Sequence, residues 1–422
     1  MQAARPAKGL SRGERLTLIA LLAVFFIDNF GIALVYPIFT PLILISDYGI
    51  TSPDMALATK VLMLGGLIAA FPAAQFFGAP ILGNIADLIG RKRAFFFTLL
   101  GEAVGYFLSG VGVELKSYAL LIISRLITGF FAGNLIICLT GLSDLSPTAK
   151  ERSRHFGYLA MVGGISFVIA ILIGGEFSDR RLDPRFNSAL PFWIAAALAL
   201  FNLYIVFNYY RDGIKKRERL RLSFTQFFRC YTPLFTLKSL VFPTLSTFFF
   251  MLGWIAALQF LSYFILESYT GNKQVITLFL LMAGTLWAIG NGLINHLLQK
   301  GLRPKTSALI SLFFAALSSL FVTARLPFHS FILFFALLSL FASLSWTNLI
   351  ATISLDVPPA MQGKTLGFVQ GVTILAVMLS PFLGASLIDY GSQTIFLFIT
   401  ISIFISFIFL LFQFIFFKKT SL

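Results

Sequence analysis

The sequence predicts an all-α polytopic membrane protein with 12 transmembrane helices, arranged as two six-helix pseudo-repeat bundles. First, the 422-residue chain is 58% hydrophobic and only 12% charged, which is about half the charged fraction of a soluble domain. Second, its apolar residues form runs long enough to cross a bilayer. Third, its basic residues gather in alternate breaks between those runs. A bilayer is therefore the expected solvent, and lipid the expected surroundings.

The apolar runs give the number of spans. A spanning helix needs about 20 mostly apolar residues. The runs that satisfy this cover residues 17–45, 59–86, 94–113, 118–141, 155–175, 189–210, 239–265, 276–298, 306–324, 331–354, 365–388 and 394–416. An even number of spans predicts that both termini lie on the same side of the membrane.

The distribution of basic residues predicts which side that is. Connections on the N-terminal side hold 24 Lys and Arg residues, and those on the opposite side hold seven. An excess of Lys and Arg marks the cytoplasmic side, so both termini are expected in the cytoplasm, with the chain in the inner (plasma) membrane of a bacterium. This topology explains the net charge of +15. Because the basic residues form no single groove or stripe, no nucleic-acid partner is expected.

A weak internal repeat predicts two similar halves. Asp144-Leu-Ser-Pro147 is echoed by Asp356-Val-Pro-Pro359, and three Gly or Asp pairs in the runs that follow share one offset. Gly, Pro and Asp also gather at any helix end, but several pairs at nearly one offset favour duplication. We expect an N-terminal bundle over 1–210, a cytoplasmic basic linker over 211–238 and a C-terminal bundle over 239–422, in a monomer.

Four segments resemble a known family. Gly83-Asn-Ile-Ala-Asp87-Leu-Ile-Gly90-Arg91-Lys92-Arg93 and Arg125-Leu-Ile-Thr-Gly129-Phe-Phe-Ala132-Gly133 resemble signatures of the major facilitator superfamily. Ile27-Asp28-Asn-Phe-Gly31-Ile-Ala-Leu-Val-Tyr-Pro37 and Glu151-Arg-Ser-Arg-His-Phe-Gly157 look like the drug:proton antiporter branch that includes tetracycline exporters. The resemblance implies the major facilitator fold, alternating access, a small-molecule substrate, and a proton gradient in place of a cofactor.

The first of these segments predicts a conformational clasp made by Gly83, Asp87, Gly90, Arg91 and Arg93. The glycines let one helix end and another begin, and the carboxylate can face the positive end of a helix dipole. The arginines can bridge to carbonyl groups or acids and so favour one orientation of the halves. Leu88 stands where the family usually has a basic residue, so one arm is missing. Alternatively, the arginines only mark the cytoplasmic side.

Three charges fall deep inside the predicted spans and are the candidates for proton coupling: Asp28, Glu102 and Arg125. A charge inside a membrane costs several kcal/mol unless it lines a cavity or finds a partner, so it usually marks function. Asp28 is the preferred proton carrier and Arg125 its expected electrostatic partner, at the position of the family's helix 4 arginine. Alternatively, Asp28 is a helix-packing acid.

Glu102 has two interpretations. Aligned with tetracycline exporters, the helix 3 carboxylate falls at Gly105, and Glu102 lies three residues earlier on the same helical face. It either replaces that carboxylate from one turn away or serves as a structural partner of Arg125.

Substrate contacts are expected from aromatic walls with a few polar groups, which suit amphipathic ligands. The candidates are Tyr36, Trp254, Gln259, Trp346 and Gln370. Packing or lipid contact is the competing explanation for each aromatic residue. The second half has no acid in mid-span, so the handling of metal chelates by tetracycline exporters is not expected.

The sequence thus predicts a proton-coupled secondary transporter that exports a small amphipathic compound. The alternative is an importer or exchanger of a polar metabolite such as an amino acid or a siderophore, in which Arg125 binds a substrate carboxylate. An enzyme is disfavoured because the three histidines are scattered and no nucleophile–base spacing is visible. A channel fits the two-half design poorly, and no metal site is expected.

Overall fold

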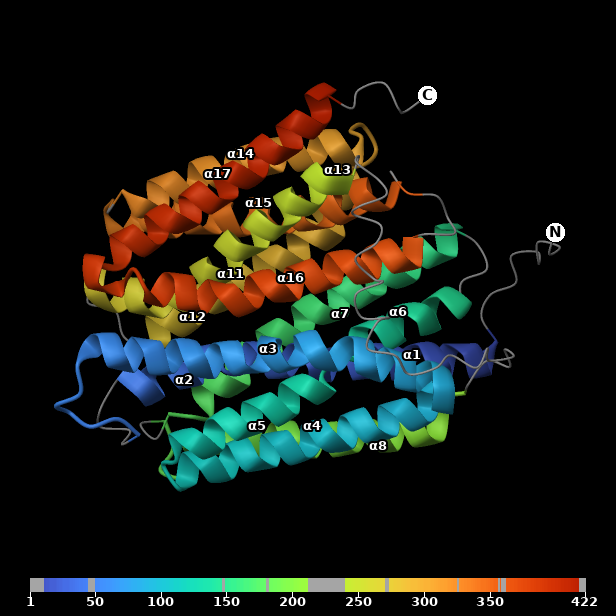
Figure 1. Ribbon diagram of the computed structural model, residues 1–422, viewed down its shortest axis with the longest axis horizontal. Coiled ribbons are helices and arrows are strands. Elements are labelled where there is room, and N and C mark those ends of the chain that lie inside the picture. The colour runs from blue at the N-terminus through green and yellow to red at the C-terminus, as the bar shows by residue number, and fades with distance from the viewer. Residues whose placement is uncertain are drawn as a thin grey trace. The chain divides into compact units, whose positions relative to one another are not determined.

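A computed structural model of the chain describes residues 11–44, 50–145, 149–179, 182–211, 240–269, 273–324, 326–355, 357 and 362–416. These residues form helices and no strand (Figure 1). The basic stretch expected to link the halves lies outside them, apart from Arg211, as does Asp356 of the repeat.

The helices confirm the predicted number of spans. Within the described residues, ten helices are long and apolar enough to cross a membrane, and two shorter apolar helices occupy the remaining predicted runs. The α-helices are α1 Arg12–Ala33, α2 Tyr36–Leu44, α3 Leu57–Ile89, α4 Arg91–Glu114, α5 Tyr118–Phe131, α6 Asn134–Asp144, α7 Ala149–Glu176, α8 Leu190–Tyr209, α11 Val241–Ser268, α12 Lys273–Ile289, α13 Asn295–Leu298, α14 Pro304–Thr323, α15 Phe328–Leu355, α16 Gln362–Ala385 and α17 Ser392–Phe416.

The first span consists of two helices rather than one. Its start is fixed by a capping box, in which the Ser11 hydroxyl accepts from the Glu14 amide and the Glu14 carboxylate accepts from the Ser11 amide. The interruption between α1 and α2 precedes Pro37, which has no amide hydrogen to continue the α-helical bonding.

The fourth span is also broken, at Ala132 and Gly133, between α5 and α6. Helix α3 packs tightly against the break. Gln75 Nε2 donates to the carbonyl oxygen of Ala132 over 2.6 Å, which satisfies a backbone acceptor at the helix end. A Cβ at Gly133 would lie 2.7 Å from the Cα of Ala79. Only a residue without a side chain permits this approach.

A π-helical segment, η3 Gly290–Ile294, interrupts the eighth span between α12 and α13. Polar pairs join this region to α15. Thr347 bonds Asn291, and Asn348 Nδ2 donates to Asn295 Oδ1 over 2.8 Å. Such a bulge widens the helix locally and often accompanies function.

The chain divides into two compact units that do not follow the order of the spans. One contains Met1–Val35 and Ala73–Leu222, and the other contains Tyr36–Pro72 and Ser223–Leu422. Helix α2, which ends the first span, and the first half of α3 therefore belong to the same unit as α11 to α17. The predicted division into two halves at 211–238 follows the order of the spans along the sequence, and it remains a proposal.

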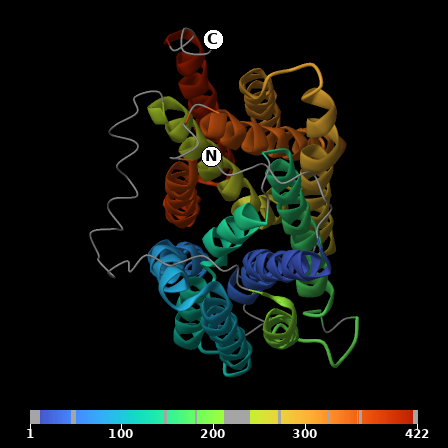
Figure 2. The ribbon, with the colours of Figure 1, turned by 90° about the vertical axis from the view of Figure 1, so that its right-hand side faces the viewer.

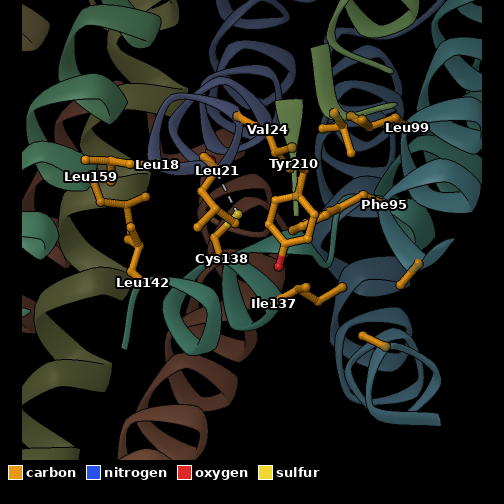
Figure 3. Packing of buried hydrophobic residues seen from close by; sticks show 14 residues of the cluster. Leu18, Leu21, Val24, Phe95, Leu99, Ile137, Cys138, Leu142, Leu159 and Tyr210 are labelled. Atoms are coloured by element: carbon orange, nitrogen blue, oxygen red, sulfur yellow. Dashed lines mark hydrogen bonds between the residues drawn. The ribbon is translucent and has the colours of Figure 1, made fainter. Parts of the chain in front are cut away.

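In the first unit, α1 packs against α6, α7 and α8. Figure 2 shows α8 next to α1 in a view along the helices. The Ser166 hydroxyl on α7 donates to the carbonyl oxygen of Phe26 over 2.6 Å, a contact that a small residue permits. An apolar cluster lies among α1, α4 and α6 (Figure 3) and includes Leu21, Phe95 and Cys138.

In the second unit, α11 packs against α15, α16 and α17, and α2 contacts α11 and α12. Aromatic rings fill this interior. Phe264 packs with Phe331 and Phe396 at ring-centroid distances of 5.4 and 4.2 Å. A Cβ at Gly384 would overlap the Phe260 ring, so this glycine allows α16 to approach α11.

The close approach of α3 to the break predicts a stability difference between two glycine substitutions. A Cβ at Gly78 would overlap the backbone carbonyl of Phe130, which cannot move aside as a flexible side chain can. We expect Gly78→Ala to destabilise the protein by about 1–3 kcal/mol through overpacking. Gly367→Ala is the matched control, because open space surrounds that helical glycine. Thermal unfolding in detergent measures both, and equal melting temperatures would contradict the packing.

Candidate functional site

A buried asparagine joins the two acids that the sequence singled out. Asn134, the first residue of α6, donates from Nδ2 to Asp28 Oδ1 over 2.9 Å and to Glu102 Oε1 over 2.8 Å. The acids come from α1 and α4 and are 3% and 0% exposed, and Asn134 is fully buried. Because both oxygens bond one nitrogen, the two carboxyl groups lie less than two hydrogen-bond lengths apart.

The arrangement of the acid pair allows one of the two carboxyl groups to be protonated. Asp28 Oδ2 and Glu102 Oε2 are buried and accept no hydrogen bond from a described donor group, and the two carboxyl groups are close enough to hydrogen-bond each other when one is protonated. The two groups also interact electrostatically. Like charges this close in a low-dielectric interior repel strongly, and protonation of one of them relieves the repulsion. The arrangement can therefore bind and release a proton.

The N-terminus of helix α6 stabilises negative charge on the two acids. The helix begins at Asn134, beside both acids, and helix N-termini carry a partial positive charge. The break in the fourth span thus places a helix start within the predicted run 118–141. A helix that ran through without interruption would have no N-terminus here.

Tyr106 completes the cluster and was not anticipated. It lies one turn after Glu102 on α4, is fully buried, and is influenced by the charges of Glu102, Arg125 and Asp28. Its hydroxyl occupies the space that a side chain at Gly31, one turn after Asp28, would take. The i to i+4 spacing from Glu102 is the only signal in the sequence, and aromatic residues are too common here for it to stand out.

Arg125 on α5 is 1% exposed and belongs to the same electrostatic neighbourhood through Tyr106. Its neighbours hold α5 against α4. Ser124 Oγ lies 2.8 Å from Ser109 Oγ, and Thr128 packs on Gly105. The predicted association of Arg125 with the acids remains a proposal.

The packing of Gly105 explains why the acid of the third span, which is α4, is found at Glu102 and not at Gly105. A Cβ at Gly105 would overlap the Thr128 hydroxyl, so a carboxylate side chain has no room at that position. Glu102, one turn earlier, reaches Asn134 and Asp28 instead. A functional role for Glu102 from this position remains a proposal.

The predicted clasp residues lie where α3 ends and α4 begins. Gly90 is the only residue between the two helices and has φ 98°, a conformation that favours glycine. Gly83 lies on α3, Arg91 is half-buried and Arg93 is exposed. Asp87 lies on α3, but its side chain is outside the described set. The clasp therefore stays a prediction.

The five candidate substrate contacts all belong to the second compact unit. Tyr36, Trp254 and Gln259 are buried, whereas Trp346 and Gln370 are half-buried on α15 and α16. Two of them have partners outside the set. The Trp254 ring stacks on Trp287 at 5.5 Å, and Gln259 Oε1 accepts from the Ser380 hydroxyl over 2.9 Å. Gln259 Nε2 is buried without a described partner.

Most of the chain matches one protein family, and characterised bacterial proteins are similar to it. The model of the Major Facilitator Superfamily matches residues 21–324 and 243–421. The tetracycline resistance protein, class H, of Pasteurella multocida is 28% identical over 381 residues, which cover 89% of this chain and 90% of that protein. The quinolone resistance protein NorA of Staphylococcus aureus is 30% identical over 176 residues, 42% of this chain and 40% of that protein.

Solved structures share the fold at lower identity. The human organic anion transporter MFSD10 (TETRAN) has a TM-score of 0.76 and 18% identity, covering 96% of this chain and all of that one. A D-xylose-proton symporter also has a TM-score of 0.76, with 14% identity, covering 95% of this chain and 97% of that one. At these identities the likeness concerns the fold alone.

Proposed function

Because the chain belongs to the major facilitator superfamily, we propose that it is a proton-coupled transporter that exports a small amphipathic compound by alternating access. Family membership makes it a multi-pass membrane transporter of a small molecule and not an enzyme. The proton, the direction and the substrate class are the parts proposed. One observation supports proton coupling most: two buried acids share one amide donor in the first unit.

In the proposed cycle, Asp28 carries the proton. Glu102 lies beside it, so ionisation of both acids at once is unfavourable because the two negative charges repel. Arg125 supplies a positive charge that reduces this repulsion. When the acids face the side of higher proton concentration, one of them takes up a proton. When they face the other side, the proton leaves. Outward movement of the substrate is coupled to inward movement of the proton, and no cofactor takes part.

The substrate class follows from the second unit and from the relatives. Among the described residues of 240–416, the acids are Glu267 and Asp389, both at helix ends. We propose that Trp254, Trp346 and Tyr36 wall the substrate cavity and that Gln259 and Gln370 contribute amides to it. Such a lining suits an amphipathic ligand better than a metal chelate. The relatives are named for resistance to tetracycline and quinolones, which supports efflux of a drug-like compound.

The remaining parts of the proposal concern placement. The chain acts as a monomer in a bacterial inner membrane, with both termini and the 211–238 linker in the cytoplasm. The clasp at Gly83 to Arg93 then lies on the cytoplasmic side, where it stabilises one orientation of the two six-helix halves.

Flux into inverted membrane vesicles tests the function. Tetracycline, norfloxacin and ethidium serve as probes, because they are amphipathic and readily followed by fluorescence. We expect at least one to accumulate when the lumen is acidified and to leave when a protonophore is added. Vesicles that carry Asp54→Asn, a change in an exposed acid, should behave as wild type. Accumulation that ignores the pH gradient would refute proton coupling, and gradient-driven uptake confined to right-side-out vesicles would indicate import.

A further inference from the structure

Asn134 makes contacts that distinguish it from an ordinary helix-packing amide. An asparagine side chain has two N–H donors, and here Nδ2 serves two carboxylates on two different helices. Its Oδ1 is buried and has no described hydrogen-bond partner, which is also true of Asn202 Oδ1, so the distinguishing feature is the pair of carboxylate acceptors. A packing amide in a membrane protein usually bonds a backbone carbonyl of the neighbouring helix. Asn202 on α8 does this, donating to the carbonyl oxygen of Ala23 over 2.8 Å.

The position of Asn134 in the chain connects the acids to the broken helix. It is the residue at which α6 begins, directly after the break. On the other side of the break, Gln75 Nε2 holds the carbonyl oxygen of Ala132. The backbone at the break therefore has α3 on one side and the acid pair on the other, with Asn134 as the connection to the acids.

From these contacts, and resting on the function proposed above, we infer that Asn134 is a positioning residue that sets the proton affinity of the Asp28–Glu102 pair. An N–H donor stabilises a carboxylate more than a carboxylic acid. Asn134 therefore favours proton release from both groups at once. Protonation weakens its hold on the acids and so releases the start of α6.

Other ionisable groups near Asn134 are few. Helix α1 presents Asp28, α4 presents Glu102 and Tyr106, and α5 presents Arg125. Cys138 lies one turn along α6 and is influenced by both acids and by Arg91. Helix α7 offers Ser166 at the level of Phe26, and its His155 lies about three turns earlier. A change in the titration of the acid pair on mutation of Asn134 would thus come from loss of its donors.

An infrared titration of purified protein in lipid tests this without any substrate. The carbonyl band of buried carboxylic acid is followed against pH and assigned by its loss in Asp28→Asn and Glu102→Gln. For Asn134→Leu, which has similar volume and keeps the backbone N–H beside Asp28 but has no side-chain donor, we expect the midpoint to move about one unit or more toward alkaline pH, a tenfold rise in proton affinity. Asn202→Leu is the matched control, and its midpoint should equal that of wild type.

A second variant keeps the test informative if Asn134→Leu does not fold. Asn134→Asp keeps the size and polarity of the side chain but replaces the amide donors with a third carboxyl group, so its midpoint should also move toward alkaline pH. If a variant at Asn134 folds and its titration midpoint equals that of the wild-type protein, the inference is overturned. This result is distinct from failure of the proposed function, which would appear as wild-type flux that ignores the pH gradient.

Discussion

Replacement of Asp28 by asparagine is expected to abolish accumulation driven by a pH gradient while preserving the fold. The substituted side chain would keep an oxygen to accept from Asn134 Nδ2 and would fill the same volume, so the packing of α1, α4 and α6 survives. It has no proton to release. A pH difference of about one unit supplies about 1.4 kcal/mol per proton, enough for about tenfold accumulation of substrate.

We therefore expect the accumulation ratio of Asp28→Asn vesicles to fall to about one, with exchange down a substrate gradient still possible. Asp54→Asn serves as the control, since that aspartate is exposed in the connection between the first two spans. Thermal unfolding checks that both variants remain folded. Full gradient-driven accumulation by a folded Asp28→Asn protein would exclude Asp28 as the carrier.

Loss of Arg125 is expected to have the second large effect, on both stability and transport. Arg125 is 1% exposed and shares its electrostatic neighbourhood with both acids through Tyr106. Removal of one member of a buried charged group typically costs about 3–5 kcal/mol, because the remaining charges lose their compensation. Arg125→Leu should therefore unfold at a markedly lower temperature than wild type at neutral pH.

The pH dependence of this effect separates charge from packing. The cation stabilises the folded protein only while the acids are charged, so the stability difference between wild type and Arg125→Leu should narrow as pH falls and the acids take up protons. The control is Arg185→Leu, which removes an exposed ion pair of 3.6 Å with Asp183 and should cost less than about 1 kcal/mol at any pH. A difference for Arg125→Leu that does not vary with pH would contradict a role in charge compensation.

Arg125→Lys distinguishes the proposed exporter from the alternative. A lysine keeps the positive charge but loses the planar guanidinium that pairs with a carboxylate in two places. If Arg125 compensates the acids, this variant should retain transport. If Arg125 instead binds a substrate carboxylate, substrate binding should disappear while proton uptake by the acid pair persists.

The membrane spans could be predicted from the sequence because a helix that crosses a bilayer must be long and apolar, and hydropathy measures this directly. The breaks within the spans could not be predicted in this way. The run 118–141 is mostly apolar, and nothing in its hydropathy indicates that Ala132 and Gly133 separate two helices. The break depends on the approach of α3 to a glycine and on Gln75 bonding a carbonyl. Such contacts join residues far apart in sequence, which a single sequence does not display.

The same distinction applies to the site. Asp28, Glu102 and Arg125 were found because charge inside a membrane is costly and therefore conspicuous. Asn134 could be named only as a polar residue in an apolar run, since its two carboxylate partners are 106 and 32 residues away in the chain. The assignment of Tyr36 to the second compact unit was equally hidden, because hydropathy marks a span and not its neighbours.

Proton release on substrate binding tests the central claim most directly. Purified wild-type protein in weakly buffered detergent, with a pH-sensitive dye, is mixed with the probe that accumulates in the vesicle assay. Asp28→Asn and Asp54→Asn are treated in parallel. We predict release of protons by wild type and Asp54→Asn and none by Asp28→Asn. Equal release by all three proteins would show that the proton comes from elsewhere.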